Sequence, residues 1–483
     1  MAVDRRRMLR LGSRAAGFVA AAAVLGATVA AAAYVPWPEH RAEPASVLVQ
    51  PAESRQQRVC PGPLLALGED AAAATTASSI GSAALVTAAE PADAVIEEIP
   101  LAADEDPRAE QNGGPVAVAA EPGGVAAGMM AGAQSQSAST ETLAGFAAAA
   151  CAEAVAESWL VAGATNLGRS GLVLLANPTD VTATVDVRVV GETGPVEAPF
   201  ALGIIVPPRS ERVLSLAGLA PNLASPVVHV TATGGAIAAS LEHSVVVGLA
   251  PAGVELTGAT AAPAASQVIP GLVVPQSGGV DAAEDHAEGD DHPAVRLFAP
   301  GEEPVNVSIG VVADSGAGGS TIEATLQPGR TTDVPLGVLD AGTYTVRIEA
   351  DAPVVAAARA TVGGATGQTD AAAPSDLAWT VATAPLLDSA VVAIPEGPSP
   401  VLHLVNPAGS AAEVGVTVDG AERTVSVPAA GAASVELRGA ASVMLTGSEG
   451  MHASVSFRAA DELAAFGVQP PGPLDSPIRV YPR

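Results

Sequence analysis

The feature that most constrains this chain is a repeated pattern of alternating apolar residues. Residues 173–189 read VLLANPTDVTATVDVRV, and residues 402–418 read LHLVNPAGSAAEVGVTV. On both sides of an Asn-Pro step, apolar residues occupy every second position. Because alternate side chains of a strand share one face, this spacing predicts two strands, each with one buried face. Proline ends the first strand, since it donates no ladder hydrogen bond.

A third copy lacks the Asn but keeps the spacing. The step Ala299-Pro300 follows Val295 and Leu297 and precedes Val307, Ile309 and Val311. Each copy continues with a turn and more alternating strands. Several short strands joined by turns are typical of an antiparallel sandwich. The predicted fold class is therefore mostly β, with tandem antiparallel β-sandwich (Ig-like) units behind one N-terminal transmembrane helix.

The repeats divide the chain into predicted segments. The sandwich units are unit 1 over 151–265, unit 2 over 266–372 and unit 3 over 373–483. They follow a strand-like extracytoplasmic start over 36–67 and a region over 68–150. This region is rich in Ala, Gly, Ser and Thr, which predicts a low-complexity, partly disordered segment. Helix-forming residues over 141–157 predict one short helix.

Two tryptophans, Trp159 and Trp379, each precede a run of alternating residues in similar surroundings, SWLVAGA and AWTVATA. We interpret them as packing residues of the sandwich cores. Ligand platforms are the alternative interpretation. Aromatic residues make up only 2% of the chain, so the cores must be built mainly from Val, Leu, Ile and Ala.

The N-terminus has the features of an export segment. Five arginines lie within residues 1–14, and residues 15–35 carry no charge. An apolar stretch of this length can cross a bilayer as a helix, and the arginines keep its start in the cytoplasm. We therefore predict a cytoplasmic basic segment over 1–14 and a single-pass transmembrane signal anchor over 15–35, with the bulk of the chain extracytoplasmic. Cleavage after 31–33 is the alternative and would give a secreted protein. The arginines also fit twin-arginine export.

Charge and cysteine content narrow the partners and the compartment. The net charge of −29 repels nucleic-acid phosphates, so no nucleic-acid partner is expected. The chain has two cysteines, Cys60 and Cys151. An even pair in an oxidising compartment predicts a disulfide, with two separate buried thiols as the alternative.

One polar cluster carries metal-ligand types. Residues 284–292 read EDHAEGDDH, and His286, Asp290, Asp291 and His292 are weak metal candidates. Their spacing fits no calcium loop or zinc motif, so a solvated loop is favoured and no metal site is predicted. The chain contains no G-x-S-x-G, no phosphate loop after a strand and no H-E-x-x-H. We therefore predict no catalytic residue, no cofactor and no enzymatic activity.

Several segments carry a family resemblance. They include CPGPLL (60–65), AGAQSQSASTETLAG (131–145), CAEAVAESWLVAGAT (151–165), LLANPTDVTATVDVRVVGETGPV (174–196), SPVVHVTATGG (225–235) and QVIPG (267–271). With these, the chain resembles the actinobacterial envelope family labelled domain of unknown function 5719 (DUF5719). The resemblance implies an N-terminally anchored, extracytoplasmic protein and supports pairing of Cys60 with Cys151. It supplies no catalytic or binding residue.

These observations favour a non-catalytic role. We expect a structural or protein-interaction component of the actinobacterial cell envelope, with other envelope proteins as partners and membrane attachment through the N-terminal helix. The alternative is a module that binds cell-wall glycan. An envelope enzyme ranks third.

Overall fold

The computed structural model describes residues 16–28, 47–49, 55–68, 76–279, 292–316, 318–363, 375–472 and 478–480. They belong to two compact bodies. The first combines both ends of the chain, Met1–Pro51 with Ser476–Arg483, and the second is the main body, Ala52–Asp475. In the first, strand β1 (Val47–Val49) pairs antiparallel with β34 (Ile478–Val480).

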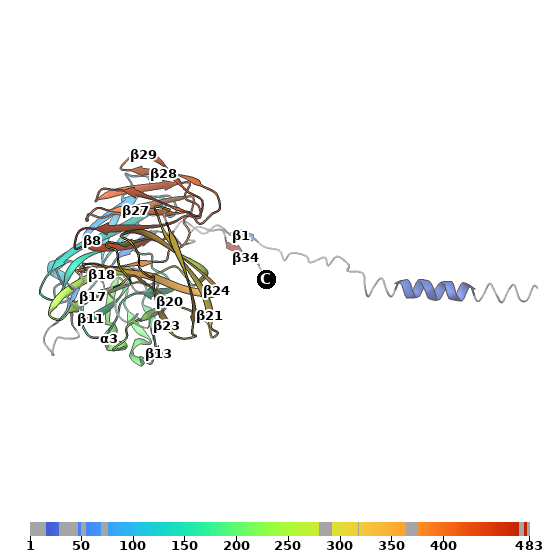
Figure 1. Ribbon diagram of the computed structural model, residues 1–483, viewed down its shortest axis with the longest axis horizontal. Coiled ribbons are helices and arrows are strands. Elements are labelled where there is room, and N and C mark those ends of the chain that lie inside the picture. Colours follow the sequence, from blue (N-terminus) through green and yellow to red (C-terminus); the bar gives the residue numbers. More distant parts are fainter. Residues whose placement is uncertain are drawn as a thin grey trace, which may run out of the picture. The chain divides into compact units, whose positions relative to one another are not determined.

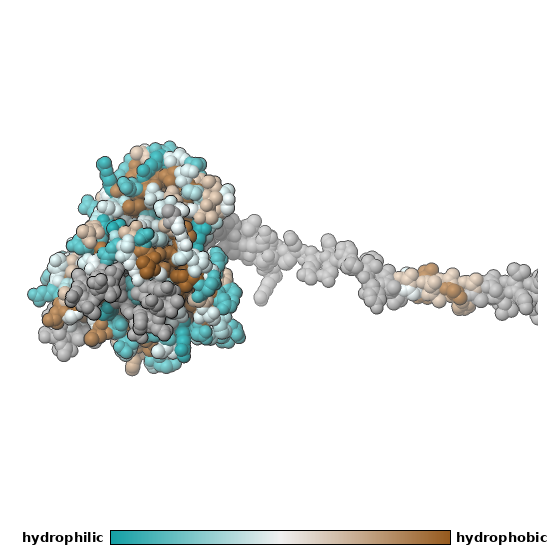
Figure 2. Space-filling model, viewed as in Figure 1, coloured by the Kyte–Doolittle hydropathy of each residue, from teal (hydrophilic) through white to brown (hydrophobic). Residues whose placement is uncertain are grey.

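The predicted membrane anchor is only partly described. A helix covers residues 16–28 and is mostly apolar on its surface (Figure 2). Residues 29–35 lie outside the described part of the chain. Among the residues that the structure describes, no helix is long and apolar enough to cross a membrane. The expected transmembrane helix over 15–35 is therefore not supported.

The main body consists of antiparallel sheets (Figure 1). Unit 1 contains β10 (Glu157–Val161), β11 (Arg169–Asn177), β12 (Ala183–Gly191), β13 (Gly194–Val196), β14 (Ile204–Val206), β15 (Ser210–Ser215), β16 (Val227–Thr233), β17 (Ala238–Val247) and β18 (Ala250–Gly258), with the one-turn helices η1 (Pro199–Ala201) and α3 (Leu216–Leu219). Its two sheets have the strand orders β10-β16-β12-β13, with β14 also beside β12, and β15-β11-β17-β18. Their facing apolar side chains form one core.

Unit 3 repeats this topology, except that the short strand β13 has no counterpart in it. Its strands are β26 (Ser389–Ile394), β27 (Val401–Val405), β28 (Ala412–Val418), β29 (Ala421–Val427), β30 (Ala432–Glu436), β31 (Ala441–Thr446), β32 (His452–Arg458) and β33 (Leu463–Val468). The two sheets run β26-β31-β28-β29 and β30-β27-β32-β33. The similar sequences over 173–189 and 402–418 thus occupy equivalent strands of equivalent units.

Unit 2 has the same connections but one continuous long strand. It contains β19 (Ala264–Val274), β20 (Ala294–Phe298), β21 (Val305–Ala313), β22 (Gly319–Leu326), β23 (Thr331–Pro335), β24 (Gly342–Val362) and β25 (Asp376–Val381). The first half of β24 pairs with β19 and β21, and its second half pairs with β20 and β25. Strand β25, which carries Trp379, therefore completes unit 2, although residues from 373 onward were assigned to unit 3 by sequence.

The expectation of a partly disordered region over 68–150 was wrong for residues 76–150. With residues 55–68 they form an N-terminal unit of β2 (Gln56–Cys60), β3 (Leu65–Leu67), β4 (Ala77–Ser79), β5 (Ala84–Ala89), β6 (Glu97–Pro100), β7 (Val116–Ala120), β8 (Met130–Ser139) and β9 (Ala144–Ala150), with the one-turn helix α2 (Ala109–Asn112). The short helix expected over 141–157 is also wrong, because residues 144–150 form β9 and no residue of this range is helical. Pairing with β8 overrides the helix preference of the Ala run.

The N-terminal unit repeats the plan of the others. Strand β7 lies between β2 and β6, as β16 lies between β10 and β12. Strand β8 lies between β5 and β9, as β17 lies between β11 and β18. Two buried glutamines of β8 add hydrogen bonds to the small apolar clusters of this unit. The Gln134 side chain accepts from the Gly62 N–H (3.0 Å), and the Gln136 side chain accepts from the Leu64 N–H (2.9 Å).

The alternating residues lie where their spacing predicted. Val185, Val187 and Val189 of β12 are at most 1% exposed, and Val307 and Ile309 of β21 are equally buried. The residues between them on the outer face are exposed or half-buried. Each of these strands therefore presents one face to the core of its unit.

The Asn of the Asn-Pro step is a buried polar residue. Asn177 is fully buried, and its amide donates to the Val181 oxygen at 2.8 Å while its own oxygen accepts from the Thr179 N–H at 3.0 Å. Asn406 makes the same two bonds, to the Ser410 oxygen (2.8 Å) and from the Ala408 N–H (2.9 Å). The repeated Asn thus fixes the same turn in units 1 and 3.

The four units close into a ring. The last strand of each unit lies at the centre of the ring. Strand β9 packs beside β18, β18 beside β25, β25 beside β33, and β33 beside β9. The sheets that carry these strands surround a common axis, in the manner of propeller blades. Each inner strand is the last strand of its sheet and packs beside the inner strands of the two neighbouring units.

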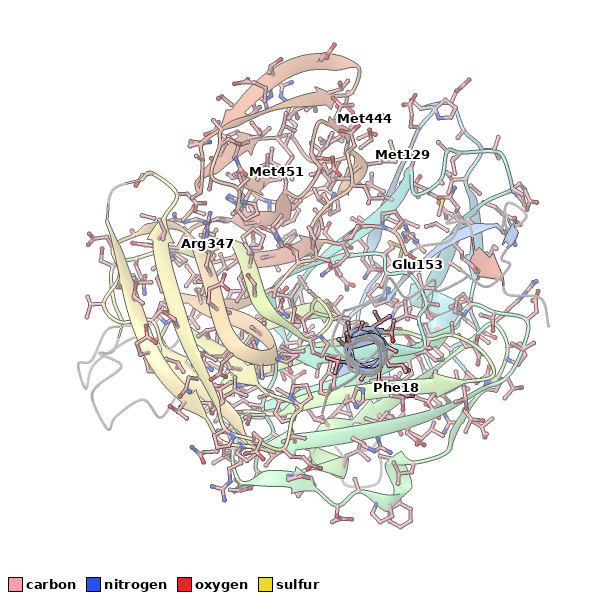
Figure 3. The ribbon with its side chains drawn as sticks, turned by 90° about the vertical axis from the view of Figure 1, so that its right-hand side faces the viewer. Phe18, Met129, Glu153, Arg347, Met444 and Met451 are labelled. Carbon is pink, nitrogen blue, oxygen red and sulfur yellow. A yellow bond between two sulfur atoms is a disulfide. The ribbon has the colours of Figure 1, made fainter. Side chains whose placement is uncertain are left out.

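Polar contacts join neighbouring units around the ring. Arg296 of unit 2 is 1% exposed, and its guanidinium donates to the Gly163, Pro226 and Ala224 oxygens of unit 1 (2.7, 3.0 and 3.0 Å). Units 2 and 3 are joined by Ser454, which donates to the Pro270 oxygen (2.7 Å), and by Arg347, which donates to the Asn406 oxygen (3.1 Å; Arg347 is labelled in Figure 3). The N-terminal unit is joined to unit 3 by Ser135, which donates to the Glu396 oxygen (2.5 Å). It is joined to unit 1 by the Leu65 N–H, which donates to the Glu242 carboxylate (3.0 Å).

Candidate functional site

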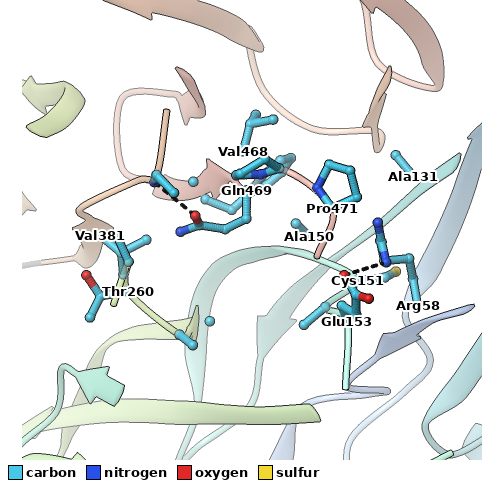
Figure 4. Close-up of a pocket in the computed structure, with 18 of the residues that line it drawn as sticks. Arg58, Ala131, Ala150, Cys151, Glu153, Thr260, Val381, Val468, Gln469 and Pro471 are labelled. Carbon is cyan, nitrogen blue, oxygen red and sulfur yellow. Dashed lines mark hydrogen bonds and ion pairs between the residues drawn. The ribbon is translucent and has the colours of Figure 1, made fainter. Parts of the chain in front are cut away.

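A cavity of about 400 Å³ lies at the C-terminal ends of the four central strands. The last residues of these strands, Ala150, Gly258, Val381 and Val468, all line it. Figure 4 labels Ala150, Val381 and Val468. We call it the central cavity. Its walls are mostly small apolar side chains, because the strands that meet there end in Ala, Gly and Val. Its volume falls within the range of small-molecule sites.

Three residues that line the cavity each have a buried polar side-chain atom with no hydrogen-bond partner among the described residues. These atoms are Nε1 of Trp159, Nε1 of Trp379 and Oγ1 of Thr257. Their residues are 7%, 1% and 2% exposed and come from β10, β25 and β18. An unpaired buried donor costs roughly 1–3 kcal/mol, so such atoms usually face a partner.

The two indole rings are held by neighbouring side chains. The ring of Trp159 stacks on His229 with centroids 3.9 Å apart and planes 11° apart. The guanidinium of Arg296 lies 4.6 Å from the Trp379 ring centroid, and that of Arg359 lies 5.6 Å from it. Both tryptophans are therefore packing residues, as expected, and both also line the central cavity, which the sequence could not show.

One rim of the cavity carries an ion pair and a segment of the C-terminal chain. Arg58 lies 3.2 Å from Glu153, and the Gly472 N–H donates to Glu153 at 2.8 Å. Burial lowers the pKa of Arg58, and the Glu153 carboxylate opposes this shift. Gln469 accepts from the Ala384 N–H at 3.1 Å. These bonds hold residues 469–472 along the cavity (Figure 4).

Asp376 lies at the other end of the central strands. Its carboxylate accepts backbone N–H bonds from Phe146 (2.9 Å), Val254 (3.2 Å), Leu463 (3.0 Å) and Leu377 (3.0 Å). One fully buried side chain therefore binds all four central strands. Burial raises the pKa of Asp376 to about 8, and the four N–H donors oppose this rise.

Two glycines make room for this carboxylate. A Cβ on Gly145 would lie 2.4 Å from an Asp376 oxygen, and one on Gly253 would lie 3.0 Å from the Asp376 Cα. Both glycines also have positive φ angles, +137° and +130°, which side-chain-bearing residues rarely adopt. The sequence gives one hint of this site, a single acid directly before the apolar run LAWTV.

Three further acids are buried in strands. Burial raises the pKa of Glu242 and of Glu211 to about 8, and raises that of Glu255 well above its ordinary value. The charge of Asp376 adds to the rise at Glu255, and the Ala465 N–H opposes it. Among the described residues, no three His, Cys, Asp or Glu side chains are grouped as metal ligands. The three acids lie on strands β15, β17 and β18, with exposures of 7% or less.

The weak metal candidates are mostly outside the described residues. His286, Asp290 and Asp291 fall in the range 280–291, which the structure does not describe. His292 is described and is 5% exposed. The expectation that these four residues form no metal site stays a prediction.

The predicted disulfide is confirmed. Cys60, at the end of β2, is bonded to Cys151, which directly follows β9, across 91 residues. The bond closes the N-terminal unit, and Cys151 also lines the central cavity.

Comparisons with known proteins identify a family but no activity. Residues 107–456 match the family described as a family of unknown function, DUF5719. No curated protein matches the sequence. A solved structure of Thermotoga maritima protein 1070 is similar at 16% identity and a TM-score of 0.19, over 25% of this chain and 92% of that one.

Two further solved structures are ice-binding adhesins. A Ca²⁺-stabilized adhesin of an Antarctic bacterium is similar at 14% identity and a TM-score of 0.11, over 81% of this chain and 92% of that one. A 1.5-MDa bacterial ice-binding adhesin is similar at 13% identity and a TM-score of 0.11, over 65% and 96%. At such scores these likenesses carry no argument about this chain.

Proposed function

Because the chain belongs to the family of unknown function DUF5719, whose description assigns no activity, we propose its function from its own residues. We propose that it is a non-catalytic, extracytoplasmic component of the actinobacterial cell envelope that acts by binding other envelope proteins. The observation that carries this proposal is the ring of four units, which buries all four inner strands and leaves loops and outer sheets at the surface.

The location in this proposal rests on three features. Arginines precede an uncharged apolar stretch at the N-terminus. The Cys60–Cys151 disulfide is of the kind that persists outside the cytoplasm. The resemblance described above implies an envelope protein held at its N-terminus. Attachment through residues 15–35 remains part of the proposal, with cleavage and release as the alternative.

In-cell crosslinking of the full chain, followed by mass spectrometry, tests the proposal. We expect to recover the same one or two envelope proteins with the chain in replicate experiments. The same recovery from cells that lack the chain should not yield them. Recovery of wall material alone would contradict a protein-binding role. N-terminal sequencing of the membrane fraction tests the anchor separately, because a chain that begins near residue 34 has lost it.

Binding of cell-wall glycan is the second candidate, and one groove favours it. A hollow of about 650 Å³ is lined in part by the hydroxyl side chains of Ser137 and Ser139 on β8 and of Thr140 in the turn that follows. Such groups match the hydroxyls of a sugar chain. Sedimentation with purified wall polymer tests this candidate. Salt-resistant co-sedimentation that is lost in Ser137→Val would favour glycan over protein.

A further inference from the structure

One strand of the N-terminal unit has a backbone edge that lacks a partner strand over part of its length. Strand β8 runs from Met130 to Ser139, but its pairing with β5 ends at Ser135, opposite Ala84. Among the described residues, 136–139 pair with β9 alone. We call the other side of 136–139 the open edge. Such an edge presents unpaired N–H and C=O groups to any extended segment that reaches it.

The β8–β9 ladder shows which backbone groups point to the open edge. The Cys151 N–H donates to the Gly132 oxygen at 2.8 Å, and the Thr140 N–H donates across the β8–β9 turn at 2.8 Å. In an antiparallel strand both backbone groups of a residue point to one side, and the side alternates along the chain. The even-numbered residues of β8 therefore bond to β9, and the N–H and C=O groups of Ser137 and Ser139 point to the open edge.

The open edge forms one side of the hollow of about 650 Å³. The other walls include Ile80, in the turn before β5, and Glu396, in unit 3. The Gln136 side chain donates to the Ile80 oxygen, and the Ser135 hydroxyl donates to the Glu396 oxygen at 2.5 Å. Both walls are thus bound to β8 itself, and the open stretch of four residues is roughly 13 Å long.

Charge distinguishes the open edge from the outer edges of the other units. Charged side chains discourage pairing at a sheet edge, and β22 carries Glu323 while β29 carries Glu422 and Arg423. The open stretch of β8 carries Gln, Ser and Ala alone. Among the described residues that line the hollow, Glu396 is the one charged residue. An extended segment with a basic side chain opposite Glu396 would therefore complement this site.

We propose that an extended segment of a partner protein, carrying a Lys or Arg side chain, adds to the open edge of β8 as a further strand. The backbone groups of Ser137 and Ser139 bond to this strand, and Glu396 binds its basic side chain. Strand addition uses main-chain hydrogen bonds for affinity, whereas a sugar chain would use the side-chain hydroxyls. The inference rests on the proposed protein-binding role and names one binding site for it.

Photocrosslinking of the full chain in cells tests the proposal. Ser82 is exposed and lines the hollow, so it is replaced by the photoreactive benzoylphenylalanine. The same replacement of Ser426, which is exposed on β29 and does not line the hollow, is the control. We expect position 82 to crosslink one envelope protein, through a segment that mass spectrometry shows to contain Lys or Arg. Position 426 should not give this product.

Two substitutions of Ser137 separate strand addition from sugar binding. Ser137→Pro removes the N–H at the open edge and no bond to β9, so the yield of the product should fall about fivefold or more. Ser137→Val removes the hydroxyl and keeps the N–H, so the yield should be unchanged. Glu396→Lys should lower the yield about threefold or more. Glu422→Lys, which reverses an exposed charge on β29, should leave it unchanged.

Several outcomes would overturn the proposal. It is wrong if position 82 gives no product, gives wall glycan alone, or crosslinks a segment without Lys or Arg. An unchanged yield in Ser137→Pro, or an equal loss in Ser137→Val, also contradicts it. Should Ser137→Pro fail to fold, Glu396→Lys and Glu422→Lys decide, and equal yields in these two refute the site. Envelope proteins recovered by crosslinking of the full chain, without a product at position 82, would keep the protein-binding role and remove this site.

Discussion

The carboxylate of Asp376 accepts a hydrogen bond from the backbone N–H of Phe146 at 2.9 Å, although 230 positions separate the two residues. Phe146 belongs to the N-terminal unit and Asp376 to unit 2. The same carboxylate also binds Val254 of unit 1 and Leu463 of unit 3. A single side chain thus connects the inner strands of four units that share one topology.

Stability should fall as the pH rises from about 5 to 8. Asp376, Glu242 and Glu211 have pKa values of about 8 in the fold, against ordinary values of 3.8 and 4.5. Between the ordinary and the raised value the folded chain holds these protons more tightly than the unfolded chain, so each rise in pH favours unfolding. We expect the free energy of unfolding to be lower by at least about 1 kcal/mol at pH 8 than at pH 5.

Urea unfolding at the two pH values measures this difference. Glu242→Gln keeps an oxygen that accepts from the Leu65 N–H but cannot ionise, so it should flatten the pH dependence. Equal or greater stability of the wild type at pH 8 would show that these acids are ionised in the fold without cost.

Replacement of Arg296 should weaken the boundary between units 1 and 2. Arg296→Met removes three bonds to unit 1 and leaves the half-buried Asp333 with Arg359, 3.8 Å away, as its cation. Loss of one partner of a buried pair costs about 3–5 kcal/mol. Chemical denaturation checks this, and Arg209→Met is the control. Its exposed pair with Asp180 should contribute less than about 1 kcal/mol. Similar losses in both variants would contradict the role given to Arg296.

The repeated Asn should be equally important in units 1 and 3. Asn177→Ala and Asn406→Ala each remove buried bonds to the backbone of the turn, at a cost of about 1–3 kcal/mol each. Asn177→Asp should also destabilise, because a carboxylate cannot donate to the Val181 oxygen. Thermal unfolding measures these changes. Asn306→Ala, on the exposed face of β21, is the control, and a loss as large as that of Asn177→Ala would refute the argument.

The strands of units 1 to 3 could be predicted because their alternating residues carry the information locally. Val185 and Val187 are buried for the same reason that their spacing suggested. Strand β9 could not be predicted, since a run of Ala favours a helix in isolation and becomes a strand only by pairing with β8. The same holds for the N-terminal unit as a whole, where Gln134 and Gln136 bind backbone groups in place of large apolar side chains.

The central site could not be predicted from any single segment. Trp159 and Trp379 were singled out for their surroundings in sequence, but only the ring brings both to one cavity. Asp376 carries no motif, because its partners are backbone N–H groups of three other strands. The Cys60–Cys151 bond was predictable, since the chain offers one pair.

Hydrogen exchange of the wild type and Asp376→Ala tests most directly that four units close around one carboxylate. Peptides that contain Phe146, Val254 and Leu463 should exchange slowly in the wild type, and all three should lose protection together in the variant, under conditions where both remain folded. Loss of protection confined to the peptide of β25, with the other three strands unchanged, would contradict the ring and the central role of Asp376.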